Sequence, residues 1–306
     1  MKVNLLFLIL LFFMFLSCTK SKTDYEAEID QEVPVYSEFE EAAVLQTESH
    51  KISVEALNGT FYKGYNDIRL KVYDKISNEK VKGAVVSFTP IRIGENEQLS
   101  SCPHLQEMVY NSGDDFLEGY VVFTERSDDN GKWAFEINLT VDGTISKARQ
   151  DVIVREQQNK NLNMTSFLGR DEREYIIALI APQSPKVGEN TLVAGIYSQE
   201  NYEIEQEYGE ATFPIYQEAQ GYTLRLDPRM PEPSMGNHSS PNNQDLTQKE
   251  DGTYEGRVNY TMTGNWTLNF IMLNEQGKVL KGTVVPDDFT PGVEGKKSEL
   301  HLDVLF

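Results

Sequence analysis

The sequence predicts an all-β protein whose folded part consists of two β-sandwich domains in tandem. Short runs of alternating, β-branched or aromatic residues recur along most of the chain, and clusters of Gly, Asn, Asp and Pro separate them. No long segment has a convincing helical period. A repeat of strand-like segments divides the folded part in two. Together these observations favour a β-sandwich in each half.

Residues 1–18 begin with a positive Lys2, continue with an unbroken apolar run from Leu5 to Phe15, and end in Ser17-Cys18. The run is too short to cross a bilayer as a helix and has the length of a signal peptide's apolar region. A small residue before a cysteine is what a lipoprotein signal peptidase requires. We therefore predict a lipoprotein signal peptide over residues 1–17 and a lipid on Cys18. The alternative is an ordinary secretory signal that is cleaved elsewhere.

A lipid on Cys18 would attach the protein to a membrane of the cell envelope. Thr19 follows the cysteine, where the enterobacterial signal for inner-membrane retention has Asp. We therefore expect a lipid-anchored protein at the outer membrane.

Residues 18–48 are predicted to form a lipidated acidic tether. From Asp24 to Glu48 there are nine acidic residues and no basic ones, with Pro34 between them. Few aliphatic side chains are available for burial, so this composition is typical of a disordered segment.

The segments that follow are predicted to form strands of two domains, residues 49–158 and residues 164–306, joined by the polar stretch Gln157–Asn163. The clearest strand-like runs are Ile68–Tyr73, Ala84–Phe88, Tyr120–Thr124, Trp133–Leu139, Tyr175–Ile180, Tyr222–Leu226 and Trp266–Leu273. Each half ends with an alternating run, near residues 151–155 and 299–306. The alternative is one larger β-domain with chance similarity between its halves.

An internal repeat supports the division. Gly64-Tyr65-Asn66 and Gly188-Glu189-Asn190 each begin a strand, and a Tyr follows nine residues after the Gly. Glu118-Gly119 and Glu255-Gly256 begin a second pair of similar strands. Both lead through a polar turn to Trp133 and Trp266, the only tryptophans in the chain.

Charge and cysteine content limit the classes of partner. The formal net charge of −20 argues against nucleic acid and against docking on anionic lipid. If Cys18 carries a lipid, Cys102 is the one free thiol of the chain, since there are only two cysteines. Burial in a core is the ordinary fate of such a thiol.

Two loops carry the residues that are candidates for binding a soft metal ion. The loop at 227–243 contains the main set, Met230, Met235 and His238. The loop at 100–108 contains a weaker set, Cys102, His104 and Met108. Thioether, thiolate and imidazole groups favour copper, especially Cu(I), over hard cations. The alternative is that the Met packs on the sandwich and the His caps a turn.

The residues around these loops resemble a known family. The stretch Asp227–Asn243, followed by Gly256 and by Met262-Thr263-Gly264-Asn265-Trp266, is similar to YtkA-like and FixH-like envelope domains, which include two-domain lipoproteins of Bacteroidetes. The resemblance covers most of residues 50–306. It implies immunoglobulin-like β-sandwiches and an association with copper handling or haem-copper oxidase assembly. Laying Ser101-Cys102-Pro103 over Ser239-Ser240-Pro241 puts Ser100 opposite His238, which departs from the family's pattern.

The leading hypothesis is a non-enzymatic, lipid-anchored envelope protein that binds copper or delivers it for oxidase assembly or efflux. Its expected partners are the membrane, through Cys18, and a copper-handling or oxidase-assembly protein. The alternative is a scaffold or recognition module that holds a glycan or protein partner without a metal. No G-x-S-x-G, H-E-x-x-H, P-loop or dinucleotide-binding motif is present, so we do not expect an enzyme.

Overall fold

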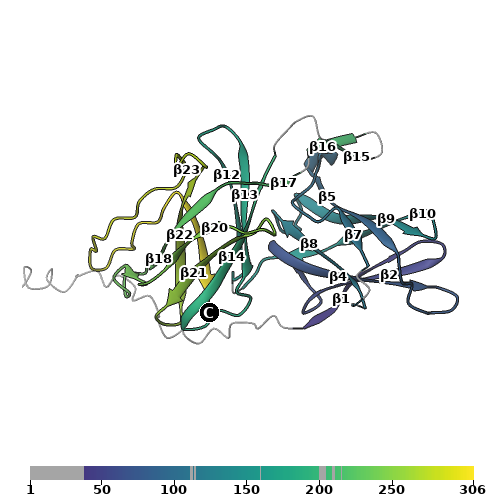
Figure 1. The fold of residues 1–306 in the computed structure, drawn as a ribbon, viewed down its shortest axis with the longest axis horizontal. Coiled ribbons are helices and arrows are strands. Elements are labelled where there is room, and N and C mark those ends of the chain that lie inside the picture. Colours follow the sequence, from purple (N-terminus) through teal and green to yellow (C-terminus); the bar gives the residue numbers. More distant parts are fainter. Residues whose placement is uncertain are drawn as a thin grey trace, which may run out of the picture. The chain divides into compact units, whose positions relative to one another are not determined.

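The fold was analysed in a computed structural model of the chain. The structure describes residues 38–110, 113, 115–158, 160–199, 205–208, 211–214 and 216–306. The predicted signal peptide, Cys18 and the tether up to residue 37 lie outside the described residues. Within these ranges the protein has 24 strands, one 3-10 turn at Glu95–Glu97 and no α-helix, which confirms the predicted all-β fold (Figure 1). No helix in the described part of the chain could span a membrane.

The first half is a sandwich of two antiparallel sheets. One sheet has the order β1 (Phe39–Gln46), β2 (His50–Leu57), β4 (Gly64–Asp74), β8 (Leu117–Phe123). The other has the order β10 (Thr144–Val152), β9 (Gly131–Val141), β5 (Val85–Gly94), β6 (Leu99–Ser100), and β7 (Glu107–Val109) also pairs with β5. Two short strands, β3 (Phe61–Tyr62) and β11 (Val154–Arg155), pair in parallel.

The alternation of side chains in β4 explains how this sandwich forms. Ile68, Leu70 and Val72 are buried in the core between the sheets. Asp67 precedes them and Arg69 lies between Ile68 and Leu70, so both alternate with the core residues and project from the opposite face. A strand with this pattern keeps one register, because a slip of one residue would exchange the two faces.

Strand β1 corrects the predicted boundary of the acidic tether at residue 48. The strand starts at Phe39 and pairs with β2 along its length. Leu45 is fully buried, and Ala42 and Ala43 pack on the core. The high acidic content hides this pattern, since Glu40 and Glu41 occupy only exposed positions.

The second half is built on one large sheet of eleven strands that folds around a core of its own. Its main path is β12 (Met164–Leu168), β13 (Glu174–Ala181), β14 (Gly188–Ser198), β21 (Tyr254–Tyr260), β20 (Gln244–Gln248), β18 (Thr223–Met230), β22 (Asn265–Leu273), β23 (Val279–Lys281). Three further strands join it: β17 (Gln217–Glu218) on β14, β19 (His238–Ser239) on β18, and β24 (Leu300–Leu305) on β22. A separate hairpin contains β15 (Glu205–Tyr208) and β16 (Ala211–Pro214).

The sequence repeat corresponds to a repeated local structure. The Asn66 amide accepts from the Tyr62 N–H and donates to the Tyr62 and Gly64 carbonyls at 2.6–2.9 Å. Asn190 makes the same three bonds with Lys186 and Gly188, at 2.7–3.0 Å. Each Gly-x-Asn segment therefore closes the corner that begins a long strand.

The two halves have separate cores, and a third apolar cluster connects them. Tyr65 and Val122 of the first half pack there with Ile176 and Tyr197 of the second. The stretch 157–163 is part of this packing, since Gln157, Asn161 and Leu162 are buried. Both halves belong to one compact unit. The proposed domain boundaries therefore remain a prediction, and part of the polar stretch that joins the halves is buried.

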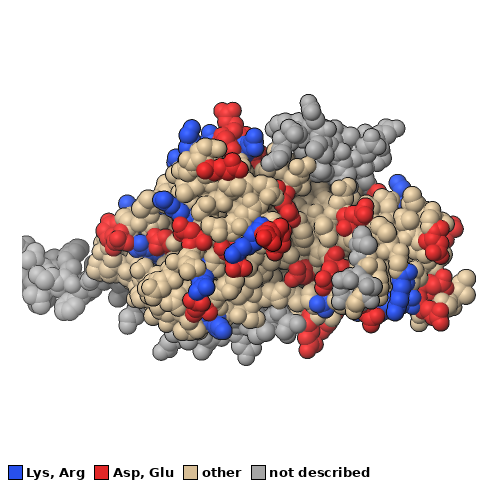
Figure 2. Space-filling view, in the orientation of Figure 1, with Lys and Arg blue, Asp and Glu red and all other residues tan. Residues whose placement is uncertain are grey.

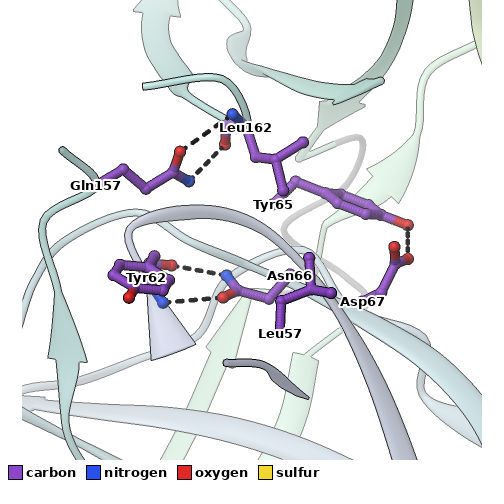
Figure 3. Close-up of a pocket in the computed structure, with 7 residues that line it drawn as sticks. All are labelled: Leu57, Tyr62, Tyr65, Asn66, Asp67, Gln157 and Leu162. Atoms are coloured by element: carbon purple, nitrogen blue, oxygen red, sulfur yellow. Dashed lines mark hydrogen bonds between the residues drawn. The ribbon is translucent and has the colours of Figure 1, made fainter. Parts of the chain in front are cut away.

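Figure 3 shows how this stretch is fixed. The Gln157 amide accepts from the Leu162 N–H at 3.1 Å and donates to the Leu162 carbonyl at 3.1 Å. Gly64 lies directly against the Leu162 carbonyl, which accepts a bond from the Tyr65 N–H at 2.9 Å. A β-carbon at Gly64 would collide with that carbonyl.

A pair of glycine variants tests this contact. Gly64 and Gly188 have nearly the same backbone angle, with φ of 102° and 105°, but a β-carbon at Gly188 would meet nothing within 4 Å. Gly188→Ala should cost about 1–2 kcal/mol, the strain of a positive φ alone. Gly64→Ala should cost about 1–3 kcal/mol more, because it also displaces Leu162. Urea denaturation measures both, and equal losses would contradict the packing role of the 157–163 stretch.

Candidate functional site

The main predicted ligands lie where strand β18 ends. The register of the pairing between β18 and β19 places Met230 directly opposite His238. The connection between the two strands contains two backbone hydrogen bonds. The Met235 N–H donates to the Glu232 carbonyl at 2.9 Å, and the His238 N–H donates to the Met235 carbonyl at 3.1 Å. The sequence spacing thus brings Met230, Met235 and His238 to one hairpin.

The turn at 261–264 lies next to this hairpin. His238 Nε2 is 2.8 Å from the Thr261 hydroxyl. A β-carbon at Gly264 would lie 2.9 Å from the terminal methyl group of Met230, so the missing side chain leaves space for that thioether. Met262 lies in the same turn with 38% of its surface exposed. The imidazole and two thioethers therefore reach a single turn.

Trp266 holds this turn in place. Its indole N–H donates to the Met262 carbonyl at 3.0 Å, and its ring is fully buried. The His238 ring meets the indole edge to face, with 6.2 Å between the ring centroids. The Tyr260 ring also packs against the indole, with 5.3 Å between the two ring centroids.

Exposure differs among the candidate ligands. Met230 is buried in the second core, whereas His238 is half-buried. Met235 is 40% exposed at the tip of the hairpin. An ion at this end would thus find one thioether fixed by packing and the other groups accessible from solvent.

The segment that contains Pro286, Asp287 and Gly295 forms hydrogen bonds with the hairpin. The Gly295 N–H donates to the Pro231 carbonyl at 2.7 Å, and the Asn237 amide donates to the Pro286 carbonyl at 3.2 Å. Arg229 is buried and donates to Asp227 at 3.0 Å and to Asp287 at 2.6 Å. These bonds hold the backbone on both sides of Met230.

The first half has different chemistry at the corresponding positions. Arg92 pairs with Ser100 in the register of β5 and β6, as Met230 pairs with His238. Trp133 donates its indole N–H to the Glu125 carbonyl at 2.9 Å, as Trp266 donates to Met262. Arg92 and Glu125 form an ion pair there. An ion pair thus occupies the place that thioethers occupy in the second half.

The weaker predicted set lies elsewhere, in the first core. Cys102 and Met108 are fully buried members of that core, and Met108 fills the space beside Gly119. Burial raises the pKa of the Cys102 thiol well above its ordinary value. These are the properties of packed core side chains.

His104 borders the same core. Its Nδ1 is 2.7 Å from the Cys102 carbonyl, and its ring lies edge-on to Phe88. Its Nε2 is buried and has no hydrogen-bond partner among the described residues. Burial lowers the pKa of His104, which favours the neutral imidazole.

No three His, Cys, Asp or Glu side chains of the described ranges form a group that could hold a metal ion. No family model and no curated protein matches the chain.

Sequence reasoning did not identify Met262 and Thr261 as members of the site. Met262 lies 24 residues after His238, and this distance in the sequence gave no reason to combine them. The repeat contained a signal that could have pointed to Met262. It places Trp133 and Trp266 after equivalent turns, and Met262 lies in the turn before Trp266.

Two methionine variants test the assigned burial. Met230→Ala should cost about 2–5 kcal/mol in unfolding free energy, because it leaves a cavity in the second core. Met262→Ala should change it by less than about 1 kcal/mol, because that side chain is partly exposed. Chemical denaturation measures both, and a small loss for Met230→Ala would show that its side chain is not packed as described.

A thiol assay tests the burial of Cys102. In a chain of residues 19–306, Cys102 is the only cysteine. We expect it to resist an aromatic disulfide reagent in the native protein and to react completely in urea, since both burial and the raised pKa suppress the thiolate. Rapid reaction of the native protein would place this thiol at an accessible surface.

Proposed function

We propose that this protein binds one soft metal ion, Cu(I), at the end of its second half. Met230, His238 and Met262 would supply the ligands, and Met235 a fourth that can close over the ion. The observation that carries the proposal is that the Met230 methyl group lies beside Gly264 and the His238 imidazole beside Thr261, at the two ends of the turn that contains Met262. Two thioethers and an imidazole favour Cu(I) over Mg²⁺ or Ca²⁺.

The hydrogen bond between His238 and Thr261 gives the imidazole a defined orientation. A hydroxyl that holds one ring nitrogen leaves the other as the metal ligand, a common arrangement around histidine ligands. Thr261 would then act as a positioning residue. Met230 would contribute a pre-positioned sulphur, because its burial removes most of the entropy cost of fixing it.

The side chains at corresponding places in the two halves differ, which supports the binding of one metal ion per chain. The corresponding place in the first half contains Arg92, Ser100 and Glu125, of which none is a soft ligand. We assign Cys102, His104 and Met108 to the core and do not count them as a second site.

The function we propose is carriage rather than catalysis. A lipid on Cys18 would keep the carrier at the envelope membrane. Transfer of the ion would require ligands that a partner can reach. Partly exposed Met235 and Met262 would let a copper-handling or oxidase-assembly partner take the ion by stepwise ligand exchange.

A Cu(I) competition titration of residues 19–306 tests the proposal. We expect tight binding of about one equivalent. His238→Ala, Met230→Leu and Met262→Leu should each weaken it by at least about tenfold, since the leucine variants remove sulphur while preserving volume.

His301→Ala is the matched control, because His301 is also half-buried and its Nδ1 bonds the Ser298 carbonyl at 2.8 Å, away from the cluster. It should bind like the unmodified chain. Equal affinity of the His238 and His301 variants would reject the site. Absence of binding would reject the metal and favour an envelope scaffold that holds a non-metal partner.

A further inference from the structure

A polar groove lies on the outer face of the first sheet, separate from the proposed metal site. Its volume is about 480 Å³. It is lined by charged and amide side chains, Asp67, Arg69, Glu118 and Gln183, and by apolar surface from Phe39 and Leu105. A volume of several hundred Å³ suits a ligand of one to two sugar rings.

Arg69 is fixed in this groove by two aromatic rings. Its guanidinium carbon lies 3.8 Å from the centroid of Phe39 and 4.4 Å from that of Phe116. The strand registers place Arg69 beside Glu55 and Glu118, yet neither forms an ion pair with it among the described residues. Glu55 instead accepts from Lys71 at 2.5 Å. The planar donors of Arg69 are therefore oriented and unoccupied.

Hydrogen bonds also hold the Asp67 carboxylate, an acceptor of the groove, in place. Asp67 receives the Tyr65 hydroxyl on one oxygen and the Gln183 amide on the other, both at 3.0 Å. The Tyr65 ring is in turn stacked on Tyr120, with 5.6 Å between centroids. Glu118 is exposed, and its carboxylate forms no ion pair or hydrogen bond within the described residues. The groove thus offers both hydrogen-bond donors and acceptors.

The surroundings narrow the class of ligand. An acidic polymer would meet Asp67 and Glu118 and a chain of net charge −20. On the face drawn in Figure 2, basic side chains are scattered among acidic ones.

We propose that this groove binds a neutral oligosaccharide, with Arg69 as the central donor. Sugar hydroxyls both donate and accept, so they match a groove in which a guanidinium, carboxylates and an amide alternate. The apolar faces of the sugar rings would contact Leu105, which is partly exposed at the groove. This site is independent of the proposed copper site.

Glycan arrays and affinity electrophoresis test the proposal with the full chain in detergent. The probes are neutral glucan, mannan and xylan fragments, with polygalacturonate as an acidic probe. We expect retention by at least one neutral glycan and none by polygalacturonate. Arg69→Lys should weaken the binding about tenfold, because lysine keeps the charge but loses the planar, ring-stacked donors.

Arg257→Ala is the control, since Arg257 is an exposed cation paired with Glu189 in the second half. It should bind as the unmodified chain does, and unfolding midpoints would verify that both variants fold. Failure of every neutral probe would overturn the proposal, as would retention by polygalacturonate alone. Undiminished binding by Arg69→Lys would overturn the role of this groove.

Discussion

The buried tryptophan of each half is the constraint on which the candidate site depends. Trp266 is completely enclosed, yet its indole N–H needs an acceptor, and the Met262 carbonyl supplies it. That bond holds the turn between β21 and β22, together with a bond from the Gly264 N–H to the Phe306 carbonyl at 2.8 Å. Since His238 and Met230 both reach this turn, its position determines whether they can act together.

The first half has the same tryptophan hydrogen bond, but different side chains surround it. Trp133 bonds the Glu125 carbonyl in the same manner, and the strand at the corresponding place presents Arg92. The Arg92–Glu125 ion pair closes that end by electrostatic attraction and hydrogen bonding. In the second half, thioethers fill the equivalent space. The two halves thus share these framework bonds, although the side chains around them differ.

Much of the fold could be predicted from local patterns. Every strand-like run named from the sequence lies in a strand of the structure or overlaps one, and the two Gly-x-Asn corners make matching bonds. Alternation and turn residues are local signals, so a single sequence is enough to read them. Strand β1 was missed because its exposed glutamates dominate its composition.

The site was harder to predict, because it depends on strand pairing. Met230 and His238 were grouped by their nearness in sequence, and the register supports that grouping. Met262 comes from another turn, and only the fold brings it close. Cys102 and His104 suggested a ligand pair by spacing alone, yet the cysteine side chain lies in a core. Spacing identifies residues that share a loop but not the direction in which their side chains point.

The packing of residues 157–163 has a consequence for how the two halves can evolve. A flexible linker would let each half be lost, duplicated or exchanged as a unit. Here Leu162 and Gln157 are bonded into the corner of β4, and Tyr65 and Tyr197 share an apolar cluster. Either half alone would expose that surface to water. Recombination at this junction would therefore separate partners that are adapted to each other, so the two halves are expected to be inherited together.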